Sequence, residues 1–242
     1  RILKINPNNP SDWSVWFNVA GVFLNNYGIV YYNGYFYVSV FSYSKITRIN
    51  ANNPADYIDS WGTLGISQPL DLTVYSNDLY IVCNNGGNSK IVKINITTPS
   101  TVYPTFATST QGLNTTRGIV YYNGFFYTTN TGKIVRIDTA GGSTDNWATT
   151  TQGLNADSSV YALAVYDNCL YVSNYTSSKI VIINLVYPTT QYNTSWPVSI
   201  SEINSPREIY VYNDNLYVCN YGNSTICQIP LEKGFFWFRV YY

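Results

Sequence analysis

The chain of 242 residues contains no histidine and no methionine, and only 11% of its residues are charged. Histidine is the commonest general base and the commonest metal ligand in proteins, so its absence excludes the enzyme mechanisms that depend on it. The 13 basic and 13 acidic side chains cancel. A net charge of zero argues against a nucleic-acid-binding protein, whose affinity comes mainly from contacts with phosphates.

Long apolar runs and cysteine motifs are also missing. No run approaches the roughly 18–20 apolar residues that a membrane-spanning helix needs, and no charged-then-apolar targeting segment stands at the start. The four cysteines show no CxxC spacing. Cys219 and Cys227 are close enough in the chain to face each other across a hairpin. Both a disulfide there and free, partly buried thiols therefore stay open.

What the chain does have is a short phrase of the type Lys-Ile-x-Arg-Ile-Asn that recurs six times. Its copies lie 43 to 46 residues apart. A fixed period of this size indicates one supersecondary unit repeated in space. The copies are residues 1–6, 45–50, 90–95, 133–138, 179–184 and 225–230.

A second block precedes five of the six copies. In it, two short runs of β-branched and aromatic residues flank Asn-Gly, Asn-Asp or Asp-Asn. These pairs tolerate the positive φ angles of a tight turn, so each block predicts a β-hairpin, strands A and B of the repeat. The blocks are residues 28–38, 72–82, 118–128, 163–172 and 209–218.

The recurring phrase then predicts strand C. Its two isoleucines are three positions apart, so in a regular strand they point to opposite faces and both faces need cover. An aromatic strand D is predicted after a turn, near residues 13–16, 57–61, 102–106, 147, 196 and 235–239. Four antiparallel strands in about 45 residues are typical of a propeller blade, and the abundant Tyr, Trp and Phe suit such sheets. No segment shows a helical period.

The last repeat resembles the NHL repeat. Residues 205–209, Ser-Pro-Arg-Glu-Ile, and residues 216–226, which begin Leu-Tyr-Val-Cys-Asn-Tyr-Gly-Asn, follow its pattern, and residues 116–119 are the next best match. Where the repeat usually has an acidic residue after strand B, this chain has Asn130, Asn174 and Asn220. The resemblance implies an all-β, six-bladed propeller of four-stranded antiparallel blades.

The strand count leaves the first blade incomplete, because six C strands face only five A–B hairpins. We expect one propeller domain over residues 1–242, with the missing inner hairpin upstream of Arg1 or an unusual ring closure. We expect the aromatic residues 234–242 to form the outer strand of the last blade. The predicted blades are 1–26 (partial), 27–67, 68–113, 114–158, 159–203 and 204–242.

Several propellers of this kind are enzymes, and each class has characteristic residues. The lyases that act on amidated peptides or streptogramins depend on histidines, which are absent. The metal-dependent lactonases have Pro-Asp-Gly and Ser-Asn-Gly signatures, which are absent too. Asp71 and Glu208, near the starts of two inner strands, leave open a weak calcium site. We otherwise expect no cofactor, no metal and no catalytic residue.

The positive charge is concentrated in strand C, which holds nine of the thirteen basic residues. Equivalent positions in successive blades are related by rotation, so these side chains spread around a ring. That geometry favours salt bridges and solvated strand ends over a nucleic-acid patch. The nine are Arg1, Lys4, Lys45, Arg48, Lys90, Lys93, Lys133, Arg136 and Lys179.

The B–C loops, at the expected channel mouth, are short, uncharged and rich in Asn, Ser and Tyr. They suit polar peptide surfaces or sugar rings, although Asn and Gly also serve turn geometry alone. The candidate binding residues are Tyr43, Asn84, Asn130, Asn174, Tyr175, Asn220 and Tyr221.

These features together predict a non-enzymatic module that binds a protein partner or belongs to an assembly. Two alternatives remain. One is a glycan-binding lectin that uses Tyr43, Tyr175 and Tyr221 as stacking rings, and the other is a metal-dependent hydrolase. The composition does not fix the compartment, and slightly favours a secreted, surface or virion-associated protein.

Overall fold

The protein consists of short antiparallel sheets in two compact units. A computed structural model describes residues 1–63, 65–84, 86–99, 105–196 and 202–233. The first unit comprises Arg1–Asn85 and Val92–Thr105, and the second comprises Gly86–Ile91 and Phe106–Tyr242. Each unit is described by itself.

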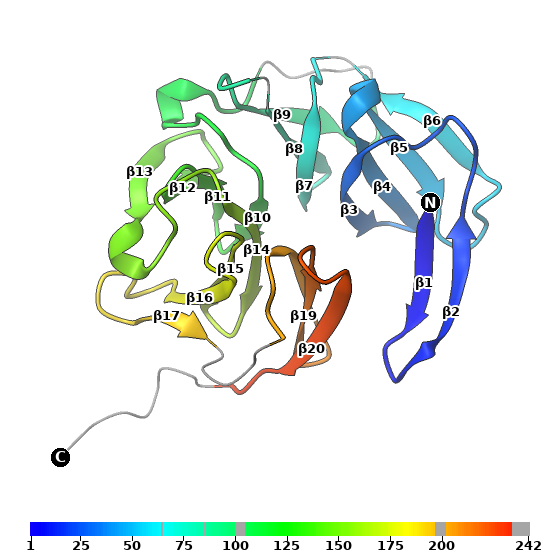
Figure 1. Ribbon diagram of the computed structural model, residues 1–242. Helices are drawn as coiled ribbons and strands as arrows, with labels where there is room; N and C mark the ends of the chain where they lie inside the picture. Colours follow the sequence, from blue (N-terminus) through cyan, green and yellow to red (C-terminus); the bar gives the residue numbers. More distant parts are fainter. Residues whose placement is uncertain (64, 85, 100–104, 197–201, 234–242) are drawn as a thin grey trace. The chain divides into compact units, whose positions relative to one another are not determined.

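The first unit contains three sheets (Figure 1). A two-stranded sheet comes first, followed by one of four strands and one of three, each with its strands in chain order. The strands are β1 (Ile2–Asn6) and β2 (Asn9–Phe17); β3 (Asn26–Tyr32), β4 (Tyr35–Val40), β5 (Lys45–Asn50) and β6 (Tyr57–Gly62); and β7 (Pro69–Tyr75), β8 (Asp78–Cys83) and β9 (Lys90–Asn95). Strand β9 passes from the second unit into the first at Val92.

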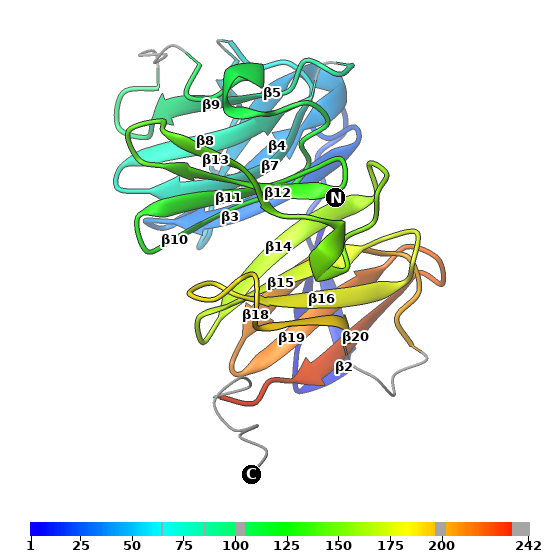
Figure 2. The same cartoon turned by 90° about the vertical axis from the view of Figure 1, so that its left-hand side faces the viewer.

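The second unit contains two four-stranded sheets and one three-stranded sheet, again in chain order. Figure 2 shows β14–β16 and β18–β20 as neighbouring strands. The strands are β10 (Ile119–Tyr122), β11 (Phe125–Asn130), β12 (Lys133–Asp138) and β13 (Ser143–Ala148); β14 (Val160–Tyr166), β15 (Cys169–Asn174), β16 (Lys179–Asn184) and β17 (Tyr192–Trp196); and β18 (Pro206–Tyr212), β19 (Asn215–Asn220) and β20 (Thr225–Pro230).

The predicted A–B hairpins are confirmed, and their turns have the expected backbone. In Asn123–Gly124 the φ angles are 45° and 88°, and in Asp167–Asn168 they are 46° and 59°. Two consecutive positive φ angles match the right-handed twist of the paired strands. The last tyrosine of strand A then fastens the sheet to its neighbour. The Tyr122 hydroxyl donates to Asn168 Oδ1 at 2.6 Å, and the Tyr166 hydroxyl donates to Asp214 Oδ1 at 2.8 Å.

The strand-C isoleucines face opposite cores, as their spacing predicts. Ile46 packs in the core between the β3–β6 and β7–β9 sheets, whereas Ile49 packs with Phe17 on the other face. In the second unit, Ile183 packs against the β10–β13 sheet and Ile180 against the β18–β20 sheet. The β3–β6 sheet of the first unit and the β14–β17 sheet of the second are therefore covered on both faces, and the core of each unit is divided into layers between sheets.

The aromatic strand D is confirmed where the structure describes it. Its tryptophan makes an edge-to-face contact with a tyrosine of strand B in three sheets, a favoured aromatic geometry. The ring centroids are 4.9 Å apart for Trp61–Tyr37, 4.9 Å for Trp147–Tyr127 and 5.6 Å for Trp196–Tyr171. Residues 234–242 and most of 102–106, where two further D strands are predicted, lie outside the described residues.

The expectation of six four-stranded blades is confirmed only in part. Among the described residues, five sheets have three or four strands, and β1–β2 has two. Three short 3-10 segments also occur where no helix is expected: η1 (Phe41–Tyr43), η2 (Ser109–Gln111) and η3 (Thr150–Gln152). No helix in the described ranges is long and apolar enough to cross a membrane.

The thiols of Cys219 and Cys227 are free. Cys227 lies directly opposite Val218 on the neighbouring strand, so it shares a face with Val218. Successive residues of a strand point to opposite faces, so Cys219 points to the other side of the sheet. The geometry therefore opposes the disulfide that the sequence left open.

Candidate functional site

The loops after strand B lie beside the start of strand A in the second unit. The backbone N–H of Tyr175 donates to Ser159 O at 2.9 Å, and the N–H of Tyr221 donates to Ser205 O at 3.1 Å. These bonds place two predicted binding residues next to the first residues of β14 and β18.

Strand A begins with a bulge that directs one side chain toward these loops. The pairing register shifts between Val160 and Leu163 and between Pro206 and Glu208. A bulge leaves an extra residue out of the ladder and redirects its side chain. Counted back from the hairpin turns, the equivalent residues at this point are Tyr27, Leu70, Arg117, Tyr161 and Arg207.

Hydroxyl groups of strand B hold the bulges together. Ser173 Oγ accepts the Ala162 N–H at 2.8 Å and donates to Arg207 O at 3.3 Å in the next sheet. Thr129 Oγ1 likewise accepts the Gly118 N–H at 2.8 Å and donates to Tyr161 O at 3.2 Å. Each hydroxyl thus joins two consecutive sheets at the residue that carries the redirected side chain.

The redirected side chains and the loop tyrosines form one cluster, the Arg–Tyr ladder: Arg117, Tyr161, Arg207, Tyr175 and Tyr221. The Arg117 Cζ lies 4.4 Å from the Tyr161 ring centroid. The Arg207 Cζ lies 3.8 Å from the Tyr221 centroid, 5.3 Å from Tyr175 and 5.5 Å from Tyr161. The rings also approach each other, with 5.2 Å between Tyr161 and Tyr175 and 6.1 Å between Tyr175 and Tyr221. All five come from the second unit.

The guanidinium groups of the ladder have few acceptors. The Arg207 Nε is buried and has no hydrogen-bond partner among the described residues. The Arg117 Nε donates to Ser158 O at 3.1 Å. The salt bridges found in the described parts of the chain involve other residues, namely Lys45–Asp59, Lys93–Asp78 and Lys133–Asp145. The ladder therefore presents half-buried positive charge beside flat rings.

Asp157 precedes Ser158, the residue whose carbonyl oxygen accepts the Arg117 Nε–H. Asp157 accepts hydrogen bonds from the Ser159 backbone N–H at 3.0 Å and, more weakly, from the Thr176 hydroxyl at 3.3 Å, and it also contacts the Ser159 hydroxyl. These bonds, led by the Ser159 hydroxyl, hold the pKa of Asp157 below its ordinary value. The carboxylate is therefore charged at neutral pH, and it is already engaged by its own loop.

The three asparagines that end strand B in the second unit belong to the scaffold. Asn130, Asn174 and Asn220 are buried. Their side-chain amides donate to the carbonyl oxygens of the preceding loop: Gly112 O at 2.6 Å, Gly153 O at 2.8 Å and Glu202 O at 2.9 Å. Their Oδ1 atoms accept backbone N–H groups of the same loops, from Thr115, Asn155 and Asn204. Their amides thus hold the loops in place.

A seven-residue motif that occurs twice in the loops indicates this arrangement. The sequence interpretation overlooked it. Residues 108–114 read Thr-Ser-Thr-Gln-Gly-Leu-Asn, and residues 149–155 read Thr-Thr-Thr-Gln-Gly-Leu-Asn. Each forms a capping box at the start of η2 or η3, followed by a glycine with φ of 85° or 89°. That glycine provides the carbonyl that the buried asparagine binds.

In the first unit, the candidate residues Tyr43 and Asn84 lie in different surroundings. Tyr43 is 46% exposed, and the Lys45 Nζ lies 4.8 Å above its ring. Lys45 is itself paired with Asp59 at 2.6 Å. The N–H of Asn84 donates to Gln68 O at 3.2 Å. No ladder equivalent to that of the second unit is found among the described residues of the first.

The carboxylates suggested for calcium belong to different units. Asp71 Oδ1 accepts the N–H of Leu72 at 2.8 Å, and Glu208 is exposed on β18. No group of three or more Cys, Asp or Glu side chains suited to a metal is found in the described residues. The calcium site stays a weak prediction.

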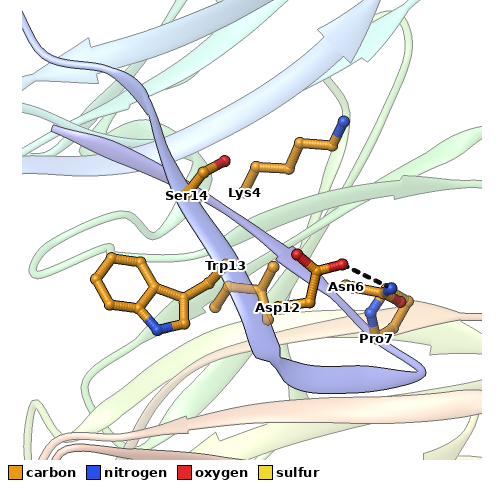
Figure 3. Close-up of a pocket in the computed structure, with 7 residues that line it drawn as sticks. Lys4, Asn6, Pro7, Asp12, Trp13 and Ser14 are labelled. Carbon is orange, nitrogen blue, oxygen red and sulfur yellow. Dashed lines mark hydrogen bonds between the residues drawn. The ribbon is translucent and has the colours of Figure 1, made fainter.

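A pocket of about 420 Å³ lies on the β1–β2 sheet (Figure 3). Asp12 accepts a hydrogen bond from the Asn6 amide at 3.1 Å, and the Trp13 ring points away from this pair. Ile5 is 40% exposed, whereas its strand-C equivalent Ile49 is fully buried. Ile2, three positions before Ile5, packs in a core cluster with Phe17, so the opposite face of this sheet is the one that is exposed.

The sequence interpretation missed Arg117, Tyr161 and Arg207. Arg117 and Arg207 are two of the four basic residues outside strand C, and each stands just before the apolar run of strand A. That shared position in two repeats is the signal that could have revealed them.

Comparison with known proteins identifies the fold. A chain in the crystal structure of a nidogen/laminin complex is similar over 85% of this chain and 76% of its own length, with a TM-score of 0.70 and 13% identity. The protein has an antiparallel β-propeller fold. The computationally designed protein Ika8 is similar over 86% of this chain and 59% of its own, with a TM-score of 0.54 and 10% identity.

No protein-family model matches the chain, and no curated protein matches it. The resemblance to the NHL repeat is therefore not confirmed. At such low identity, the similar structures establish the fold alone.

Proposed function

We propose that this protein is a non-enzymatic, NHL-like propeller that recognises a protein partner through the Arg–Tyr ladder. The finer architecture, a propeller of six blades, belongs to the same proposal. The ladder is the observation that carries the proposal, because it gathers five side chains of the types that dominate protein interfaces.

The chemistry of the ladder supports recognition. Tyrosine and arginine are enriched among the few interface residues that contribute most of the binding energy. Tyr221 is 58% exposed, whereas Arg207 beneath it is only half-exposed. A partner would therefore contact a ring that Arg207 already holds in place. The Tyr221 side chain would then lose little conformational entropy on binding. The similar chain described above comes from a protein complex, which agrees with this use of the fold.

The absence of catalysis is part of the proposal. The sequence contains no histidine. Burial raises the pKa of the Cys169 thiol to about 12 and that of Cys219 to about 11, so both are protonated and unreactive at neutral pH. A metal-dependent hydrolase remains the less favoured alternative. A lactone and ester screen with added calcium would support it only if turnover disappeared in Asp71→Asn or Glu208→Gln.

Site-specific photocrosslinking tests the proposed function. A photoreactive phenylalanine analogue at position 221, expressed in the source cells, should give one dominant adduct whose partner is identified by mass spectrometry. Tyr210, 68% exposed in the same unit, is the matched control position. The purified partner should then bind Tyr221→Ala at least tenfold more weakly than Tyr210→Ala, a loss of about 1.4 kcal/mol. Equal affinities of the two variants would refute the proposal.

Glycan binding is a second candidate, supported by the exposed rings of Tyr221 and of Trp13, which is 58% exposed beside Asn6 and Asp12. Aromatic faces and amide or carboxylate groups suit sugar rings. A glycan array should then show a hit that Tyr221→Ala or Trp13→Ala abolishes. The absence of any hit would remove this candidate.

A further inference from the structure

We propose that the Arg–Tyr ladder receives the carboxylate side chain of an acidic peptide segment of the partner. The inference rests on the proposed function and names the chemistry of the partner. It is carried by two arginines that form no salt bridge among the described residues, Arg207 with an unsatisfied Nε and Arg117 with only the Ser158 carbonyl as acceptor, within a protein of zero net charge.

The stacking of Arg207 determines which of its atoms remain to bind a ligand. Tyr221 covers one face of the guanidinium at 3.8 Å. A ring over the face leaves the N–H groups, which lie in the guanidinium plane, available at the edge. These groups form a planar fork that matches the two oxygens of a carboxylate. The Nε is buried and has no acceptor among the described residues, so the charge of Arg207 is uncompensated within the fold and the Nη groups are the atoms that a ligand can reach.

Other cations of the chain show what a satisfied charge looks like here. Lys45, Lys93 and Lys133 each pair with an aspartate. The Arg136 Nε is also buried without a partner among the described residues, but this guanidinium lies 4.5 Å above the Phe125 ring and donates from Nη2 to Thr144 Oγ1 at 3.3 Å. Arg207 has neither kind of contact among the described residues. A charge that its own fold leaves uncompensated is complementary to an acidic partner.

The guanidinium of Arg117 provides a second point of contact, which orients a bound peptide along the site. Arg117 and Arg207 both contact the Tyr161 ring, at 4.4 and 5.5 Å. Arg117 is half-exposed and retains donors besides the Nε that Ser158 O accepts. An extended segment with two carboxylates can therefore engage both arginines, while the residue between the carboxylates passes over Tyr161, the ring that both arginines contact.

The negative charge of Asp157 repels an acidic ligand, so its removal tests whether the ligand is negatively charged. Asp157 is charged beside Ser158, which binds Arg117, and is held by Ser159 and Thr176. Like charge at an interface disfavours the wrong partner. Removal of this charge in Asp157→Asn should therefore strengthen the binding of an acidic peptide and leave a neutral peptide unaffected.

The probes are capped hexapeptides with two glutamates flanking a leucine or tyrosine, and the same peptides with glutamine in place of glutamate. Binding is followed by the side-chain Nε–H resonances of arginine in the full chain. We expect the acidic peptides to shift the Arg207 and Arg117 resonances, and the glutamine counterparts to bind at least tenfold more weakly. Affinity should fall as salt is raised, as expected for exposed ionic contacts.

The variants separate charge from fork geometry. Arg207→Gln should abolish the shift of the remaining Arg117 resonance, Arg207→Lys should retain a weak, salt-sensitive shift of it, and Arg136→Gln should bind as the wild type does. Far-ultraviolet circular dichroism and Tm confirm that each variant is folded. If Arg207→Gln does not fold, the comparison of Arg207→Lys with Asp157→Asn carries the test.

Three outcomes would overturn the inference. Equal binding of the glutamine peptides would show a neutral recognition surface, in which case the proposed function survives. Equal shifts at Arg136 would show non-specific attraction. Absence of binding by every peptide, or binding only of an acidic oligosaccharide such as a hyaluronan fragment, would show that no acidic peptide is the ligand. The crosslink at position 221 decides the proposed function independently.

Discussion

The sheets of both units follow the same succession of strands, A to D, but the units differ in the residue that ends strand B. In the second unit this position holds Asn130, Asn174 and Asn220, whose amides hold the adjoining loops. In the first unit the equivalent residues are Val40 and Cys83, which are fully buried. One unit therefore fixes its loops with buried side-chain hydrogen bonds, whereas the other fills the same space with apolar atoms.

The difference extends to the residues that face solvent at this end. The second unit positions two arginines that have no salt bridge among the described residues beside three tyrosines, whereas in the first unit Tyr43 lies under a lysine that is already neutralised by Asp59. A satisfied charge contributes to the fold, and an unsatisfied one remains available to a ligand. The contrast shows how repeats of one pattern can divide scaffold and recognition between them.

The largest effect should come from Gly118→Ala. A Cβ at this position would overlap the Tyr161 carbonyl and lie 3.0 Å from Ala162 Cα, both backbone atoms of the next strand A. The strands would have to separate, at a cost of about 3 kcal/mol. At Gly28, in the first unit, the corresponding contacts are 2.9 Å to Asp71 Cα and to Leu70 O, so Gly28→Ala should cost less. Urea unfolding of both variants measures the difference.

A null effect of Gly118→Ala would mean that the sheets adjust freely at the bulge. A larger loss for Gly28→Ala would reverse the assignment of the tighter approach to the second unit.

The next effect tests the buried asparagines. Asn174→Val copies the first-unit solution into the second unit and leaves Gly153 O and the Asn155 N–H without their partner. Buried polar groups that lose a partner cost about 1–3 kcal/mol, so we expect about 2 kcal/mol lower stability. The exposed Ser177→Val is the matched control and should change stability by less than about 0.5 kcal/mol.

The reverse substitution, Val40→Asn, buries an amide in an apolar site and should also destabilise. If either substitution left stability unchanged, asparagine and valine would be equivalent at the end of strand B. The proposed difference in how the two units are stabilised there would then be wrong.

Part of this structure could be predicted from the sequence. The turn residues Asn123–Gly124, the opposed isoleucines Ile46 and Ile49, and the aromatic strand D follow from local rules of turn geometry and strand alternation. The burial of Asn174 does not, because an asparagine beside a loop has the same sequence pattern whether its amide meets solvent or a carbonyl group.

The ladder was harder to predict for a different reason. Tyr161 and Arg207 are neighbours only because consecutive repeats stack, and their side chains meet only because a bulge redirects each of them. The predicted loop residues Tyr175 and Tyr221 do meet, but the arginines between them required the position of the bulge. Periodicity predicts that two positions are equivalent, but it does not give the direction of an unpaired side chain.

A smaller effect concerns the tyrosine hydrogen bonds between sheets. Partial burial and the hydrogen bond to Asp214 raise the pKa of Tyr166 to about 12. The unfolded chain releases this proton near pH 10. The stabilisation is therefore complete below about pH 10 and is lost as the pH rises to about 12. In the first unit the Tyr32 hydroxyl donates to neutral oxygens of Ser76 and Asn77 instead.

Tyr166→Phe should lower stability by about 1 kcal/mol at pH 7 and flatten the alkaline loss relative to the wild type. Urea unfolding at several values between pH 7 and pH 12 measures the difference between the two proteins. An unchanged difference over that range would exclude titration of Tyr166 as its cause.

The smallest effect on stability should come from the exposed loop tyrosines, and it separates recognition from folding. Tyr43→Ala and Tyr221→Ala should each change stability by less than about 0.5 kcal/mol, because both rings are largely exposed. Their effects on partner binding should differ, because Tyr221 covers the unpaired Arg207 whereas Tyr43 lies under the paired Lys45. Titration of the crosslinked partner against both variants measures this. Equal losses of affinity would extend the recognition surface to the first unit, and a loss confined to Tyr43→Ala would transfer it there.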